Sequence, residues 1–487
     1  MKKPARSRQT GGKEITTTVK RRFPPKSPML SKGRGVSSGQ SQPGGILWPQ
    51  LHSGTVGYIH ALQVQFWQTE RWPPERLLQA QLTQIQALIS HAANTVPFYQ
   101  DRLKDVATLP PGKLTLEAFR RLPLLTRTEI QDAGESLVTQ ALPPGHGSMS
   151  DIKTSGSSGR PVRIKSSSLA GKFVAARGLR YNLWHRRDFL GKNVTMISLP
   201  PGTEEKKSQS WAVGIKTGPS VILNHNFPAA KLLEALIRED PDYLQIHPST
   251  LRELLRISRE TGLRPRKLRE VRTLGDNLDG DIRDLCRWEW NIGISDNYSC
   301  QELGIIALQC PDSPDQPRMH VMGECLLVEV LNDEGKACKA GEMGRIVATD
   351  LHNYATPLIR YELGDYAEAG PPCGCGRTLP VLSQIAGRER NLAILPNGDK
   401  VTPLLAMEPL IVELPIRQYQ MIQKSLTEVE VKMTTSRPLT EEEENKFRNF
   451  IGRCLHYPFN CRFDYVDEIP RGPGGKFEIF RCEVASS

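Results

Sequence analysis

Eight consecutive residues identify this chain better than any other part of it: Thr154-Ser155-Gly156-Ser157-Ser158-Gly159-Arg160-Pro161. Small residues let the backbone approach an anion closely, and successive N–H groups with hydroxyl groups can surround phosphate oxygens. A Ser/Gly run is also typical of turns and linkers. Because no Gly-Lys-Ser/Thr follows the glycines, the stretch is not a Walker A loop. Other parts of the chain must decide between a phosphate loop and a linker.

Four motifs follow this loop in a fixed order: Tyr298-Ser-Cys-Gln-Glu302, Arg360-Tyr-Glu-Leu-Gly-Asp365, Gly387-Arg388 and Gly474-Gly-Lys476. This ordered set resembles the adenylate-forming superfamily, which includes acyl-CoA synthetases, peptide-synthetase adenylation domains and luciferases. Further stretches are similar to the phenylacetate–coenzyme A ligase family, at residues 90–99, 341–351, 357–361 and 373–380. The resemblance extends from roughly residue 60 to the C-terminus.

The resemblance implies an α/β fold with two domains. A large N-terminal adenylate-forming domain, a layered α/β structure with a small β-rich subdomain, is expected at residues 46–387. A small mobile α/β domain carrying a catalytic lysine is expected at residues 388–487. Residues 1–45 are expected to form a basic disordered tail.

Local patterns agree with an α/β fold. From Pro74, apolar residues repeat at helical spacing (Leu78, Leu82, Ile85, Ile89 and Ala92), and Thr126-x-x-Glu129 is typical of a capping box. Short apolar runs at 194–199, 221–223 and 243–246 alternate with helical patterns at 230–239 and 250–261.

The later part of the chain is richer in strand patterns. Runs at 325–331 and 345–350 predict the β-rich subdomain. Beyond Arg388, a strand pattern at 429–433, a helix from Thr440 to about Leu455 and a strand at 463–466 predict a small α/β domain.

Most candidate site residues take their roles from the resemblance. The loop residues Thr154, Ser155, Gly156, Ser157, Ser158 and Gly159 would bind the phosphates of ATP. Glu302 would bind the Mg²⁺ that bridges these phosphates, Tyr298 would lie near the adenine, and Asp365 would accept hydrogen bonds from the ribose hydroxyls. Arg388 would lie near the ribose and phosphates, and Lys476 would be the catalytic lysine. The chain departs from the superfamily pattern at Val162, where lysine is common, and at Arg390, where aspartate or lysine is common.

The resemblance implies a reaction in which ATP activates a carboxylic acid. The carboxylate and the α-phosphate are both anionic, so the site must offset their repulsion and stabilise the departing pyrophosphate. The resemblance implies an aryl or arylacetic acid as the small-molecule partner and coenzyme A as the acceptor of the acyl group, after a hinge rotation of the C-terminal domain. Two alternatives stay open: a different acceptor (an amine, a carrier protein or a cofactor), and a weakened relative that acts as a binding or assembly protein.

A separate set of residues has the composition of a structural zinc site: Cys310, His320, Cys373 and Cys375. Three thiolates and one imidazole form a closed tetrahedral set that leaves no position open for catalysis. The alternative is four unrelated side chains, because the Cys-x-Cys spacing is tighter than that of a usual zinc knuckle.

The distributions of charge and of cysteine along the chain restrict the remaining classes of partner and cellular location. Of the net charge of +11, residues 1–45 carry +10, so we expect a non-essential tail, a nearly neutral body and no specific nucleic-acid partner. No apolar run reaches the roughly 18–20 residues that cross a bilayer, and all ten cysteines lie after residue 285. We therefore expect no transmembrane segment and a cytoplasmic protein. The oligomeric state is left open, with a homodimer as one option.

Overall fold

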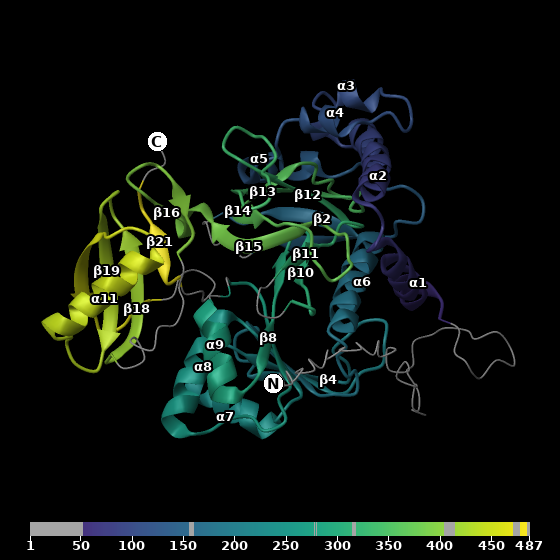
Figure 1. The fold of residues 1–487 in the computed structure, drawn as a ribbon. Coiled ribbons are helices and arrows are strands. Elements are labelled where there is room, and N and C mark those ends of the chain that lie inside the picture. Colours follow the sequence, from purple (N-terminus) through teal and green to yellow (C-terminus); the bar gives the residue numbers. More distant parts are fainter. Residues whose placement is uncertain are drawn as a thin grey trace, which may run out of the picture. The chain divides into compact units, whose positions relative to one another are not determined.

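The computed structural model describes residues 52–154, 160–276, 278, 280–313, 318–403, 414–470 and 478–484. Two large sheets, one smaller sheet and the helices that cover them account for most of this part of the chain (Figure 1).

The first helices confirm the local sequence patterns. Helix α2 (Pro74–Thr95) has Pro74 in its first turn and buries all of the predicted stripe except Leu78, which is half-buried. It also buries Leu77 and Leu88, so the buried face is wider than expected. Helix α5 (Arg127–Ala133) begins with the complete capping box between Thr126 and Glu129. The other helices of this region are α1 (Gly54–Thr69), α3 (Lys104–Ala107), α4 (Leu116–Arg120) and α6 (Ser168–Trp184).

A six-stranded sheet forms the first layer of the α/β fold, in the order β4-β5-β3-β6-β7-β8. All neighbouring strands are parallel except the edge strand β4. Its strands are β3 (Asn193–Ile197), β4 (Glu205–Ser208), β5 (Ser220–Asn224), β6 (Tyr243–Ile246), β7 (Glu270–Thr273) and β8 (Gly293–Ser295). The parallel strands are apolar because helices cover them.

Three helices pack their apolar faces on this sheet: α7 (Ala229–Glu239), α8 (Pro248–Thr261) and α9 (Gly280–Trp290). They lie together beside β8 in Figure 1. One core cluster joins strand residues such as Val194 and Leu244 to helix residues such as Leu236 and Leu254. The alternation of strands and helices predicted at 194–261 is therefore confirmed.

A seven-stranded antiparallel sheet forms the second layer, in the order β12-β13-β14-β15-β11-β10-β9. Its strands are β9 (Asn297–Cys300), β10 (Gly304–Gln309), β11 (Met319–Val321), β12 (Leu326–Leu331), β13 (Met343–Asp350), β14 (Tyr361–Ala369) and β15 (Val381–Arg388). The two strands predicted at 325–331 and 345–350 are β12 and β13. They form one edge of this larger sheet, which shares a core with α1, α2, α5 and α6.

The segment after β15 has a core of its own. It contains β16 (Ala393–Ile394), β17 (Lys400–Val401), β18 (Ile416–Gln423), β19 (Glu428–Thr435), α11 (Glu441–Cys454), β20 (Asn460–Tyr465) and β21 (Phe480–Cys482). Four of the strands pair in the order β20-β19-β18-β21. Phe447, Phe450 and Ile451 of α11 pack on Val431 and Met433 of β19. The strand predicted at 429–433 and the predicted helix are thus confirmed as β19 and α11, and the strand predicted at 463–466 overlaps β20. A second capping box, at Thr440, starts α11.

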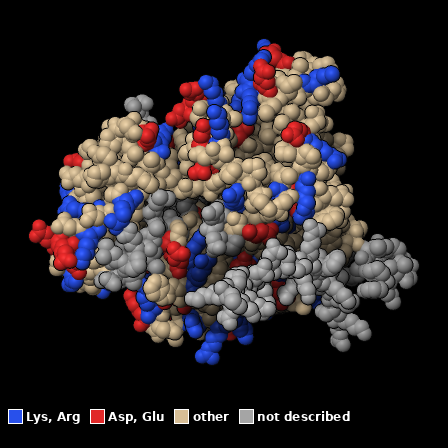
Figure 2. All heavy atoms as spheres, in the orientation of Figure 1, with Lys and Arg blue, Asp and Glu red and all other residues tan. Residues whose placement is uncertain are grey.

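The surface shows charges of both signs. On the face drawn in Figure 2, lysine and arginine side chains are interspersed with aspartate and glutamate side chains. Within the described residues, no helix combines the length and the apolar character that crossing a membrane requires.

Candidate active site

A cavity of about 1180 Å³ brings together five residues that the sequence assigned to a nucleotide site. Its lining includes Thr154, Tyr298, Glu302, Asp365 and Arg388. They come from separate parts of the chain, so tertiary structure alone brings them together. The other predicted site residues, 155–159 and Lys476, lie outside the described residues.

Thr154 stands at the base of the predicted phosphate loop. It follows strand β1 (Met149–Lys153), which pairs with β2 (Arg163–Ser167) in an antiparallel hairpin. The Thr154 amide donates to the carbonyl of Val162 at 3.0 Å, and the Val162 amide donates to Thr154 Oγ1 at 2.9 Å. The Val162 side chain, at a position where the sequence departs from the superfamily pattern, is fully buried in the core. The hairpin therefore holds the two ends of the loop together.

Glu302 lies in the turn between β9 and β10 rather than at the start of a helix. Its side chain is buried, and its Oε1 accepts from Arg127 Nη1 at 3.3 Å and from the Tyr361 hydroxyl at 3.3 Å. Arg127 also donates to Thr154 Oγ1 at 3.1 Å. One arginine thus connects the base of the loop to the carboxylate that the sequence assigned to magnesium.

Asp365 is the centre of a second group of contacts. Its Oδ2 accepts from the Tyr298 hydroxyl at 2.7 Å, and its Oδ1 lies 3.0 Å from Arg388 Nε. Asp365 and Arg388 are directly paired neighbours on β14 and β15. Gly364 has a φ of +74°, and a Cβ there would lie 2.9 Å from Arg388 Nη1, so the Gly-Asp sequence gives the arginine room beside the carboxylate.

The Tyr298 hydroxyl remains a proton donor over the whole useful pH range. Burial, reinforced by the nearby Asp365 carboxylate, raises the pKa of Tyr298 well above its ordinary value. The carboxylate therefore receives one neutral donor and one cation, and it keeps lone pairs for further donors such as the hydroxyl groups of a sugar.

Two basic residues of the motifs have partners away from the cavity. Arg160 pairs with Asp132 at 2.5 Å on the surface. Arg360 is buried and pairs with Glu329 of β12 at 3.1 Å, so it joins strands rather than lining the cavity. Arg390, where the sequence departs from the superfamily pattern, differs from these two: it lines the cavity and pairs at 2.6 Å with Glu478, which lines the cavity as well.

Sequence reasoning missed three residues that line or support the cavity. Arg127 follows the capping residue of α5 directly, and this position was the one available signal for it. Tyr361 was quoted within a motif, but its contact with Glu302 has no signature in the sequence. His247, which belongs to none of the motifs, lines the cavity at the start of α8.

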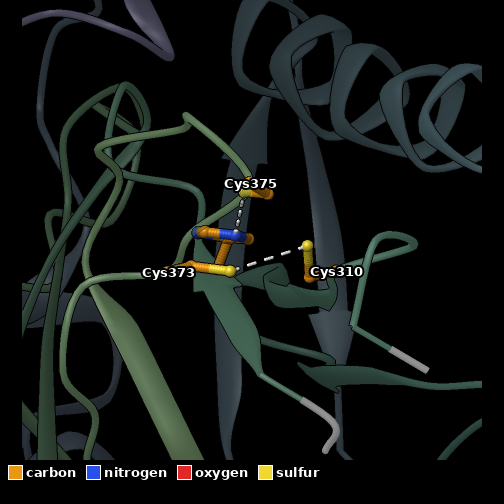
Figure 3. Close-up of side chains that lie close together, drawn as sticks. Cys310, Cys373 and Cys375 are labelled. Atoms are coloured by element: carbon orange, nitrogen blue, oxygen red, sulfur yellow. Dashed lines mark hydrogen bonds between the residues drawn. The ribbon is translucent and has the colours of Figure 1, made fainter. Parts of the chain in front are cut away.

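The four predicted zinc ligands also come together. Figure 3 shows the three cysteines among them, Cys310, Cys373 and Cys375. Cys310 follows β10, His320 is on β11, and Cys373 and Cys375 lie in the loop between β14 and β15. Their ligand atoms all lie within 4.8 Å of one another. Cys310 and Cys373 have Sγ atoms 3.9 Å apart, and Cys375 Sγ lies 3.3 Å from His320 Nε2. With Zn–S bonds of about 2.3 Å, tetrahedral geometry places two sulfurs about 3.8 Å apart.

Comparisons with known proteins agree with this arrangement. Residues 394–482 match the family model of the CapK C-terminal domain. The chain is 25% identical to a phenylacetate–coenzyme A ligase of Thermus thermophilus over 77% of this chain and 84% of the relative. It is 22% identical to a phenylacetate–coenzyme A ligase of Pseudomonas putida over 69% of this chain and 76% of the relative.

Solved structures share the fold at low sequence identity. A 2-hydroxyisobutyryl-CoA ligase in the postadenylation state, in complex with R3-HIB-AMP, aligns with a TM-score of 0.66 and 18% identity, over 85% of this chain and 91% of that one. The anthranilate CoA ligase AuaEII, in complex with anthranoyl-AMP, aligns with a TM-score of 0.50 and 17% identity, over 67% of this chain and 64% of that one. The chain thus has the fold of the adenylate-forming ligases. The two relatives confirm the sequence resemblance to the phenylacetate–coenzyme A ligase family.

Proposed function

We propose that this chain is an AMP-forming acid–thiol ligase. It activates a carboxylic acid with ATP, releases pyrophosphate and transfers the acyl group to coenzyme A. The observation that carries this proposal is the cavity in which Thr154, Glu302, Tyr298, Asp365 and Arg388 come together. The names of the curated relatives support an aryl or arylacetic acid as the substrate.

The contacts of Asp365 favour binding of the ribose. A carboxylate with two fixed partners, Tyr298 and Arg388, has a fixed orientation and can accept hydrogen bonds from neighbouring hydroxyl groups. The aromatic ring of Tyr298 would then lie near the adenine. Arg388 adds positive charge beside the phosphates.

Glu302 fits a magnesium site beside the phosphate loop. Mg²⁺ prefers carboxylate oxygens together with phosphate oxygens, and Glu302 is a buried carboxylate on the cavity wall next to Thr154 and Arg127. The ion would supply positive charge against the triphosphate. Residues 155–159 remain proposed donors to the phosphates, and Lys476 remains the proposed catalytic lysine of a mobile C-terminal domain.

Release of pyrophosphate tests the activation step. We would supply Mg-ATP and a panel of acids, including phenylacetate and benzoates, with and without coenzyme A. The expected result is acid-dependent release of pyrophosphate, with a thioester only when coenzyme A is present. Release without a thioester would point to another acceptor. ATP binding with no release for any acid would favour the alternative of a binding protein.

We also propose that Cys310, His320, Cys373 and Cys375 hold one structural zinc ion. The donor set and the 3.9 Å sulfur separation suit a closed tetrahedral site. Zinc there would fix the loop between β14 and β15 to β10 and β11, because the ligands come from these elements.

Metal analysis by mass spectrometry tests the zinc proposal. We expect about one zinc per chain in the purified protein and none in the Cys373→Ser, Cys375→Ser double variant. Cys338→Ser is the matched control, because Cys338 is a free, half-buried cysteine outside the cluster. A folded wild-type protein without zinc would contradict the proposal.

A further inference from the structure

One side of the cavity carries a buried arginine, Arg272, which has no part in the nucleotide site described above. It is on β7 of the six-stranded sheet, beside Gln245 of β6 in the strand register, and both side chains line the cavity. The five candidate nucleotide residues come from other elements, none of which belongs to this sheet. The cavity therefore extends from the candidate nucleotide residues to a wall made by the parallel strands.

Neutral groups hold Arg272 in place. Its Nη1 donates to Asn182 Oδ1 at 3.3 Å, and its Nη2 donates to Asn193 Oδ1. The guanidinium carbon lies 5.6 Å from the centre of the Trp211 ring. The residue is only 5% exposed, and its Nε is buried without a hydrogen-bond partner among the described residues.

Glu270 attracts the positive charge of Arg272 but does not form an ion pair with it. Glu270 lies two residues earlier on the same strand, but it is occupied by Arg187, whose Nε and Nη2 lie 2.7 and 2.9 Å from its two oxygens. No described carboxylate forms an ion pair with Arg272. Burial, followed by repulsion from Arg187, lowers the pKa of Arg272 to about 10, so the side chain remains charged at neutral pH.

A buried arginine without an ion-pair partner destabilises the folded protein unless a ligand supplies the opposite charge. Buried charges in proteins are normally paired, because an isolated ion loses its hydration without compensation. A guanidinium matches a carboxylate especially well, since its N–H groups can bind both oxygens. Leu179, Trp211 and Ala212 line the same cavity and supply apolar surface for the body of a ligand.

We propose that Arg272 binds a second anionic group on the acid substrate, at the end away from the carboxylate that is activated. This inference rests on the proposed function and narrows its substrate class. The preferred substrates are aryl acids that carry a second carboxylate or a similar anion. Arg272 then acts as a specificity residue, and the activation chemistry takes place at the other end of the substrate.

A matched pair of acids tests this proposal. Phenylacetate and 4-carboxyphenylacetate differ only in the second carboxylate. We expect the wild-type kcat/KM for pyrophosphate release to favour the dicarboxylate by about 10- to 150-fold, the usual contribution of a hydrogen bond to a charged group. Arg272→Met should bring the ratio to 1 or below, and Arg272→Lys should retain part of the preference. Because each ratio is taken within one variant, a lower folded fraction does not change it.

A control variant separates local from general effects. Arg283 is a half-buried arginine whose pKa is also lowered, chiefly by burial, but it binds the Ile294 carbonyl and Gln309 and does not line the cavity. Arg283→Met should keep the wild-type ratio. Equal losses for both acids in Arg272→Met, or a wild-type preference for phenylacetate, would overturn the proposal.

Calorimetric binding of the two acids, in the presence of a non-hydrolysable ATP analogue, separates this inference from the proposed function. Arg272-dependent binding of the dicarboxylate without pyrophosphate release would support the inference and contradict the ligase activity. Release with phenylacetate preferred would support the ligase and overturn the inference. If neither acid bound nor reacted, both would be contradicted.

Discussion

Replacement of Tyr298 by phenylalanine tests whether the contacts of Asp365 prepare the nucleotide site. The change removes one hydroxyl that donates to Asp365 Oδ2 at 2.7 Å and leaves the buried ring in place. A hydrogen bond to a charged group is worth about 1.5–3 kcal/mol, which corresponds to a loss of roughly 10- to 150-fold in affinity. We expect a loss of up to this size in ATP affinity, because Asp365 would keep only Arg388 to hold its orientation.

Calorimetric titration of ATP into four proteins measures the effect: wild type, Tyr298→Phe, Asp365→Asn and the double variant. Residues in direct contact are expected to couple, so the double variant should lose less than the sum of the single losses. Tyr465→Phe is the control, because the Tyr465 hydroxyl also donates to a carboxylate, that of Glu444 at 2.8 Å, but does not line the cavity. Additive losses, or a change of less than twofold in Tyr298→Phe, would refute the reasoning.

The loss of ATP affinity in Tyr298→Phe should be the same at every pH between about 6 and 9. The pKa of Tyr298 is raised in the folded protein, so the phenol is protonated in both the folded and the unfolded chain below the ordinary value of about 10. Its contribution to stability is therefore fully present at neutral pH. It is lost only when the pH rises through the higher pKa of the folded state.

Glu302→Gln should reduce acid-dependent pyrophosphate release at least about 100-fold, because it removes the negative charge that is proposed to bind the magnesium ion. It should also raise the magnesium concentration needed for half-maximal release, and an unchanged magnesium titration would contradict this. Lys476→Ala should abolish release while calorimetry gives an ATP affinity near that of wild type, and normal turnover would exclude the lysine. Gly364→Ala should weaken ATP binding because its Cβ would meet Arg388 at 2.9 Å in a backbone conformation that favours glycine; normal affinity would show that this close approach is unimportant. Cys373→Ser should lose the zinc and lower the thermal midpoint by several degrees, and a stable variant that keeps one zinc per chain would exclude Cys373 as a ligand.

Local patterns predicted the elements well. The capping box at Thr126 and the apolar stripe of α2 depend on neighbours three or four residues away, so the sequence contains the whole signal. The four proposed zinc ligands also lie together, as their residue types suggested, although their Cys-x-Cys spacing is not that of a usual zinc knuckle. These ligands lie in segments about fifty residues apart, and the pairing of β10, β11 and β15 brings them together.

The residues that the sequence did not reveal are those whose role depends on packing. Arg127 reaches Glu302 only because α5 packs near the turn after β9, and no local pattern marks that contact. Arg272 looks like an ordinary strand residue until the occupation of Glu270 by Arg187 is known. The number and order of strands in the seven-stranded sheet could likewise not be predicted from the sequence, because they follow from pairing between distant segments.

The central claim is that the acid becomes joined to AMP before the thiol attacks. The most direct test uses an acid labelled with ¹⁸O at both oxygens of its carboxylate. In the proposed reaction a carboxylate oxygen attacks the α-phosphorus and pyrophosphate leaves; the thiolate then attacks the carbonyl carbon, and AMP departs with that oxygen. Mass spectrometry should therefore find one ¹⁸O in the AMP for each thioester formed. Unlabelled AMP, or ¹⁸O in inorganic phosphate together with ADP, would contradict the account.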